Sequence, residues 1–384
     1  MSGNTSHPKD ELKLTPNRAL HIPSGSILPH ILLWALQLVA LTSPPFHGRR
    51  AFFSVAILSL AVLSQINPHF TNDIALAQPF TIGWSIYLST LEKILFSPDP
   101  GPEASLWHVD KPAREALSYP ALGLQKLRWA FVIMFNQRGV RWNFEVKNVP
   151  KAKKLSRRPF LASQTLNLVY YVLMADLVAQ LGIRLLYTAP NGQVGSFNSK
   201  YLTLRHPDWR WSFVKALIFG ATPYYICCMQ YTMFSIPAVL LGLSKPEDWP
   251  PIFGNLKDAT TVREFWGKYW HQTIRKSLTA YTTTFVSMLN IRRGTTLSSY
   301  TQLWLAFAIS GTMHANSMLG LPRPLNITTA ECTLGMLRFF LWQALAITSE
   351  DFVMTVLGMR LGEETFLPGT LVGQWVERLV PIPP

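Results

Sequence analysis

Residues 161–187 read LASQTLNLVYYVLMADLVAQLGIRLLY, and this stretch decides the fold class. A helix needs about 20 mostly apolar residues to cross the hydrocarbon core of a bilayer. The stretch is longer than that, and its only charged residues are Asp176 and Arg184. It therefore predicts a membrane-spanning helix. An acid inside a span is either functional or neutralised by a partner, so Asp176 is interpreted as a functional group or as an ion-pair partner of Arg184.

Apolar runs of similar character lie on both sides of this span. They cover residues 27–41, 51–66, 74–96, 213–243, 278–289, 300–321 and 333–357. The run at 213–243 is too long for one upright helix, and it contains Pro223 and Pro237, where a helix can kink or divide. Together the runs predict an all-α fold, a multi-pass transmembrane helical bundle of about eight spans.

The overall composition agrees with a membrane protein. Hydrophobic residues make up 48% of the chain and charged residues 15%, against about 25% charged residues in soluble domains. The net charge is +14. In a soluble protein this excess would suggest nucleic-acid binding, but no zinc-finger or RNA-recognition signature interleaves with the basic residues. The excess is instead interpreted as attraction to anionic lipid and a positive cytosolic face.

A long polar insertion over residues 97–158 separates the span at 74–96 from the span at 161–187. Its second half holds a single acid, Glu145, among many basic residues. They are Arg138, Arg141, Lys147, Lys151, Lys153, Lys154, Arg157 and Arg158. Because basic residues are enriched in cytosolic loops, this insertion is predicted to be a cytosolic loop.

The predicted organisation is a polar N-terminal segment over residues 1–25 and a single membrane domain over residues 26–384. The first 25 residues are polar and show no charged region followed at once by an apolar core and a cleavage site, as a signal peptide would,. We therefore expect the first span itself to direct insertion into the membrane.

The first candidate for chemistry is TVREFWGKYWHQTIR, at residues 261–275. Thr261 and Glu264 have the spacing of a capping box, so a helix is predicted to start here. A helical wheel gathers the aromatic residues on one face, as in a helix that lies in the membrane interface. The opposite face holds Gly267, Lys268, His271 and Arg275. The glycine leaves room for a ligand and the cations suit phosphate groups; the alternative is a lipid-surface helix whose polar residues are only solvated.

The second candidate is His314, in the stretch FAISGTMHANSML at residues 307–319. A titratable group at membrane depth is expected to face a cavity or a partner, because exposure to lipid is costly. Ser310, Gly311 and Ser317 share its helical face, and these small residues leave room for substrate or for a closely packed helix. The alternative is a structural histidine that is hydrogen-bonded to a neighbouring helix.

Both segments carry a resemblance to a known family. FWGKYWHQ at residues 265–272 resembles the FWG-x-x-W-[NH] motif of wax synthase-like proteins in the membrane-bound O-acyltransferase superfamily. SGTMH at residues 310–314 resembles the Ser-Gly-x-x-His motif of the same family, and RGVRWNFEVKNVP at residues 138–150 is similar to a stretch common in its fungal branch. That branch commonly acetylates terpenoid or meroterpenoid alcohols in secondary-metabolite pathways.

The resemblance implies a role for several residues. His314 matches the intramembrane histidine regarded as the catalytic base, and His271 matches the Asn-or-His position that supplies the second residue of the reaction centre. Trp266, Trp270 and Lys268 match the body of the first motif and, with Arg275, are the candidates for binding the acyl donor. The pair at 268–269 departs from the family, which often has two arginines there, and this weakens the phosphate-binding assignment.

The expected reaction is direct transfer of an acetyl group from acetyl-CoA, a co-substrate rather than a resident cofactor, to a hydroxyl of a hydrophobic alcohol. No metal site is expected, and no cysteine or serine is paired with a base in the motifs to form an acyl-enzyme. The protein is expected to be an integral membrane protein of the endoplasmic reticulum, with the bilayer, acyl-CoA and the alcohol as its partners. The alternatives are long-chain wax or sterol ester synthesis and, more distantly, a transporter or membrane scaffold.

Overall fold

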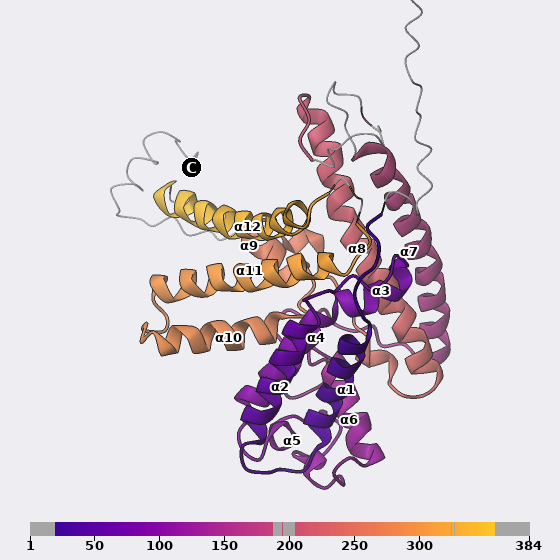
Figure 1. Ribbon diagram of the computed structural model, residues 1–384, viewed down its shortest axis with the longest axis vertical. Coiled ribbons are helices and arrows are strands. Elements are labelled where there is room, and N and C mark those ends of the chain that lie inside the picture. The colour runs from indigo at the N-terminus through magenta and orange to yellow at the C-terminus, as the bar shows by residue number, and fades with distance from the viewer. Residues whose placement is uncertain (1–19, 187–193, 195–203, 324, 326, 358–384) are drawn as a thin grey trace, which may run out of the picture.

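The computed structural model describes residues 20–186, 194, 204–323, 325 and 327–357, and the regular elements in this part of the chain are helices (Figure 1). The α-helices are α1 (Leu28–Thr42), α2 (Arg49–Leu63), α3 (Ile74–Thr81), α4 (Gly83–Phe96), α5 (Pro102–Ser105), α6 (Leu124–Phe135), α7 (Arg157–Leu185), α8 (Trp209–Leu240), α9 (Val262–Glu264), α10 (Arg275–Met288), α11 (Thr296–Leu319) and α12 (Thr329–Leu357). The all-α prediction is confirmed for these residues. Most of the predicted N-terminal segment lies outside them.

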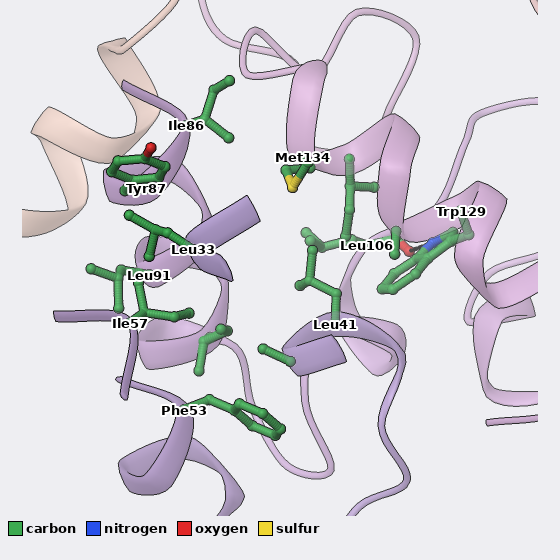
Figure 2. Close-up of a cluster of buried hydrophobic side chains, with 14 of the residues drawn as sticks. Leu33, Leu41, Phe53, Ile57, Ile86, Tyr87, Leu91, Leu106, Trp129 and Met134 are labelled. Carbon is green, nitrogen blue, oxygen red and sulfur yellow. Dashed lines mark hydrogen bonds between the residues drawn. The ribbon is translucent and has the colours of Figure 1, made fainter. Parts of the chain in front are cut away.

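The N-terminal half is built around a core between α1, α2, α4 and α6 (Figure 2). Leu33, Ile57, Leu91 and Met134 face one another there and are almost completely buried. The insertion at 97–158, predicted to be a cytosolic loop, contains α6, which packs against α1; its cytosolic placement stays a prediction. The apolar residues of α6 form a helix that is too short to cross a membrane, and the charged residues of the insertion outnumber them. The polar composition of the insertion as a whole therefore does not reveal this helix.

A buried ion triad ties the same insertion to the core. The Glu103 carboxylate is fully buried and lies 2.7 Å from Arg49 Nη1 and 3.5 Å from Lys126 Nζ. Both cations are themselves less than a tenth exposed. Buried charges are tolerated where they are paired, and removal of one partner leaves an uncompensated charge in a medium that solvates it poorly.

We expect Glu103→Ala to lower the free energy of unfolding by about 3–5 kcal/mol, because two cations then remain buried without a counter-charge. Thermal unfolding of the detergent-solubilised protein measures this as a reduced apparent melting temperature. Asp99→Ala is the matched control, since Asp99 is 97% exposed and pairs with Arg50 at the surface, where an ion pair contributes little. Equal melting temperatures for the two variants would contradict a stabilising role of the triad.

Three of the described helices are long and apolar enough to cross a membrane: α7, α8 and α12. The predicted eight spans are therefore not confirmed. α1 and α2 have 15 residues each, fewer than the roughly 20 that a span needs, and the run at 74–96 is divided between α3 and α4.

α7 and α8 run side by side (Figure 1). α8 is continuous over 32 residues with Pro223 and Pro237 inside it, so the division considered for residues 213–243 does not occur. Asp176 is exposed on α7, and no ion pair joins it to Arg184 within the described part of the chain. The proposed pairing of these two residues is not formed.

Candidate functional site

The first motif does not form the single interfacial helix predicted over residues 261–275. Thr261 caps α9, its hydroxyl accepting from the Glu264 N–H at 3.0 Å, so the predicted start is confirmed. The chain then forms a π-helical turn at Phe265–Tyr269 and turns to extended backbone at Trp270. α10 begins only at Arg275. His271 therefore lies in the connection between two helices, not one helical turn beyond Gly267 on a common face.

Aromatic packing accounts for this change of helix type. The rings of Phe265 and Trp270 stack at 5.5 Å, and Trp266 meets Trp270 at 5.7 Å. The Trp270 N–H donates to the Phe265 carbonyl at 2.7 Å, a bond that spans five residues. Such π turns widen a helix locally and are frequent at functional sites. Here the turn places His271 at the end of an aromatic wall, the packed rings of Phe265, Trp266 and Trp270.

His271 is enclosed by aromatic rings and keeps a free ring nitrogen. Its ring lies 5.6 Å from that of Trp270 and 6.0 Å from that of Phe253. Nδ1 is buried without a hydrogen-bond partner among the described residues. Burial, followed by the nearby charges of His314 and Arg138, lowers the pKa of His271 to about 3. The imidazole is therefore neutral at physiological pH and has a nitrogen available for a ligand.

Arg138 braces the loop that precedes the motif. The side chain is buried, and its guanidinium donates to the carbonyls of Pro251 at 2.8 Å and Pro250 at 3.2 Å. It also donates to the Tyr231 hydroxyl of α8 at 2.8 Å. A few residues on, Phe253 contacts His271. The insertion at 97–158 thus reaches the candidate site, and in the sequence only the similarity at residues 138–150 pointed to this contact.

His314 lies on α11, which packs between α10 and α12 (Figure 1). Its ring stacks on that of Phe340 of α12, with centroids 4.7 Å apart and planes within 5°. No hydrogen bond holds the imidazole to another described residue, so the interpretation as a histidine hydrogen-bonded to a neighbouring helix gains no support. His314 and His271 belong to one chain of ring contacts, since Trp266 contacts both Phe340, on which His314 stacks, and Trp270, which contacts His271.

α12 anchors the first motif, which the sequence did not reveal. The Glu350 carboxylate accepts from the backbone N–H groups of Val262 at 3.1 Å and Arg263 at 3.3 Å, at the start of α9. Gln343 accepts from Trp266 Nε1 at 3.2 Å. The only available signal was the acidic pair Glu350–Asp351 inside an otherwise apolar run, because acids in such a run usually have a partner.

The four predicted donor-binding residues divide into two groups. Trp266 packs against Phe307 and Phe340, and Trp270 packs against Phe253 and Phe265. Both therefore belong to the aromatic wall that carries the histidines.

The two cations lie at the edge of this wall. Lys268 is half-exposed and pairs with Glu264 one turn away. Arg275 donates to the Gly267 carbonyl at 2.8 Å and to Gln272 Oε1 at 2.6 Å. Binding of the acyl donor by these four residues remains a prediction. Among the described residues no group of His, Cys, Asp and Glu has a metal-binding arrangement.

The two histidine motifs lie within one family match. The profile of the "Membrane bound O-acyl transferase family" matches residues 249–342, and that of the "Aspirochlorine biosynthesis protein F C-terminal domain" matches residues 156–240. The chain is 46% identical over 232 residues to Aspirochlorine biosynthesis protein F of Aspergillus oryzae. The aligned region covers 60% of this chain and 90% of that relative.

Curated acetyltransferases are more distant relatives. Acetyltransferase ple2 of Rhodocybe pseudopiperita is 33% identical over 259 residues, 66% of this chain and 63% of the relative. Acetyltransferase sirH of Emericella nidulans is 32% identical over 237 residues, 60% of this chain and 51% of the relative. The similarity to these two thus spans between half and two thirds of their length. No solved structure matches the chain.

Proposed function

The chain belongs to the membrane-bound O-acyltransferase superfamily, in its fungal acetyltransferase branch, and on that premise we propose that it transfers an acetyl group from acetyl-CoA to a hydroxyl of a hydrophobic small molecule. The family match agrees with the acyltransferase that the two motifs predicted. The observation that carries the proposal is the convergence of His271 and His314, from separate segments, on one aromatic wall, each with a ring free of competing hydrogen bonds to neighbouring side chains.

The proposed reaction is a direct transfer between the two substrates. His314 takes the proton of the acceptor hydroxyl as the oxygen attacks the thioester carbonyl carbon, which makes it a general base. The negative charge that develops on the carbonyl oxygen is stabilised by a hydrogen bond from neutral His271. The intermediate collapses with cleavage of the carbon–sulfur bond, and the His314 imidazolium returns its proton to the departing thiolate of coenzyme A.

The names of the relatives favour acetyl as the transferred group, since ple2 and sirH are both acetyltransferases. The acceptor is proposed to be a terpenoid or meroterpenoid alcohol of fungal secondary metabolism, on the resemblance of the motifs to that branch. A hydrophobic acceptor is compatible with a protein in which three of the described helices are long and apolar enough to span a bilayer. The endoplasmic reticulum is the proposed membrane.

Membranes that contain the protein test this proposal when they are supplied with radiolabelled acetyl-CoA or palmitoyl-CoA and a panel of terpenoid alcohols. Label that passes from acetyl-CoA into an organic-soluble ester, and does so only with the protein present, supports the acetyltransferase. Transfer only from palmitoyl-CoA would assign the protein to wax or sterol ester synthesis. Silence with both donors across the panel would favour a transporter or scaffold.

A further inference from the structure

We propose that Phe340 is a positioning residue for His314: its ring fixes the plane of the imidazole and stabilises the imidazolium that forms during transfer. The proposal deepens the function proposed above and rests on it, because the role exists only if His314 accepts a proton. Phe340 lies outside both sequence motifs, on a helix that the sequence identified only as a membrane span.

The stacking geometry is the primary observation. The Phe340 and His314 planes lie within 5° at a centroid distance of 4.7 Å. The other rings around Phe340 meet it at larger angles, Trp266 at 47° and Phe339 at 89°. A parallel stack leaves the edges of the imidazole free, and both ring nitrogens lie on those edges. Phe340 therefore holds the ring without occupying either nitrogen.

Phe340 is itself held in place from several sides. It is buried and contacts Trp266 at 5.7 Å and Phe339 at 5.4 Å. The backbone of α11 lies directly against α12 at this point. A Cβ atom on Gly311 would lie 2.9 Å from the Phe340 Cβ and 3.1 Å from Leu337. Only a residue without a side chain lets α11 and α12 approach this closely, so the glycine one turn before His314 makes the stack possible.

The face of an aromatic ring carries partial negative charge and attracts a cation positioned over it. His314 is uncharged before the reaction and positively charged once it holds the proton of the acceptor. Phe340 consequently interacts more strongly with the state that forms along the reaction than with the starting state. An interaction of this kind raises kcat and leaves substrate binding almost unchanged.

The place of Phe340 on α12 adds an alignment function. Gln343 and Glu350, three and ten positions further on, hold the first motif through Trp266 and the start of α9. Residues at such spacings lie on one side of a helix. One rigid helix therefore holds the segments of both histidines, and Phe340 is its contact with His314.

Phe340→Leu tests the role, since leucine keeps an apolar side chain and removes the ring. We expect kcat to fall about tenfold, with the KM values for acetyl-CoA and for the acceptor unchanged. Phe340→Tyr restores an aromatic face and should restore kcat. Phe352→Leu is the matched control: it removes an exposed ring from the same helix, α12, and should leave kcat near the wild-type value. Each rate is normalised to the amount of protein in the membrane.

Two results would overturn the assignment in an active protein: a Phe340→Leu variant with the wild-type kcat, or an equal loss of kcat in Phe340→Leu and Phe352→Leu. A structural readout separates this failure from failure of the proposed function. The ring current of Phe340 should move the NMR signal of the His314 ring protons upfield in protein labelled at histidine, and Phe340→Leu should abolish that displacement. An unchanged signal removes the stack, and a wild type without transfer activity removes the role together with the proposed function.

Discussion

His314→Ala should slow acetyl transfer strongly while the protein still accumulates in the membrane. A positioned general base contributes about 10²–10⁴-fold to the rate of a proton-transfer step, so kcat is expected to fall by that factor. The side chain makes no hydrogen bond to another described residue and its loss breaks no polar contact of the fold. Label transfer from acetyl-CoA in matched membranes measures the effect.

Ser317→Ala is the control for His314→Ala. Ser317 lies one turn further along α11, and its hydroxyl donates only to the Met313 carbonyl of its own helix, at 2.9 Å. We expect this variant to turn over at close to the wild-type rate. A His314→Ala variant that transfers acetyl as fast as Ser317→Ala would remove His314 from the mechanism.

His271→Ala is the second variant with a large expected effect. Removal of one hydrogen-bond donor to a developing oxyanion costs about 10²–10³-fold in kcat. His271→Asn should retain most of the rate, because an amide donates a similar hydrogen bond and the motif that this segment resembles has Asn or His at this position. The comparison of the two kcat values is the measurement, and equally inactive variants would argue against a hydrogen-bonding role.

The pH profile provides a further check on His271. Since burial lowers its pKa to about 3, the group is neutral throughout the range of about pH 5–8 in which an ordinary histidine titrates. His271→Asn should therefore leave the shape of the kcat profile in that range unchanged. A profile whose acidic limb disappears in His271→Asn would show that His271 is protonated within the working range.

The sequence predicts which two histidines are candidates for catalysis, but it does not predict how they are arranged. His314 is conspicuous because it stands among small residues in an apolar run, and His271 belongs to a recognisable motif. The helical wheel misplaced His271 because it assumes 3.6 residues per turn, whereas the bond from Trp270 to Phe265 closes a wider turn. That choice depends on ring packing, which spacing along one helix does not encode.

Tertiary partners account for most of what the sequence did not predict. Phe340, Gln343 and Glu350 acquire their roles only when α12 lies against α9 and α11. The sequence likewise did not reveal α6, because its apolar face packs against core residues that come from other parts of the chain. The all-α class needed no such information, because the long apolar stretches determine it locally.

The brace at Arg138 limits how these enzymes can be recombined. Pro250 and Pro251 supply carbonyl acceptors and, as prolines, no N–H groups. Arg138, more than a hundred positions away in the chain, donates to both carbonyls, and the Tyr231 hydroxyl also donates to that of Pro250. A chimera that transplants residues 249–342 alone into a relative would carry these acceptors along without Arg138, and whatever side chain the host has at that position would replace it. The exchangeable unit is therefore discontinuous: it comprises the segment with the two histidines together with the stretch around Arg138.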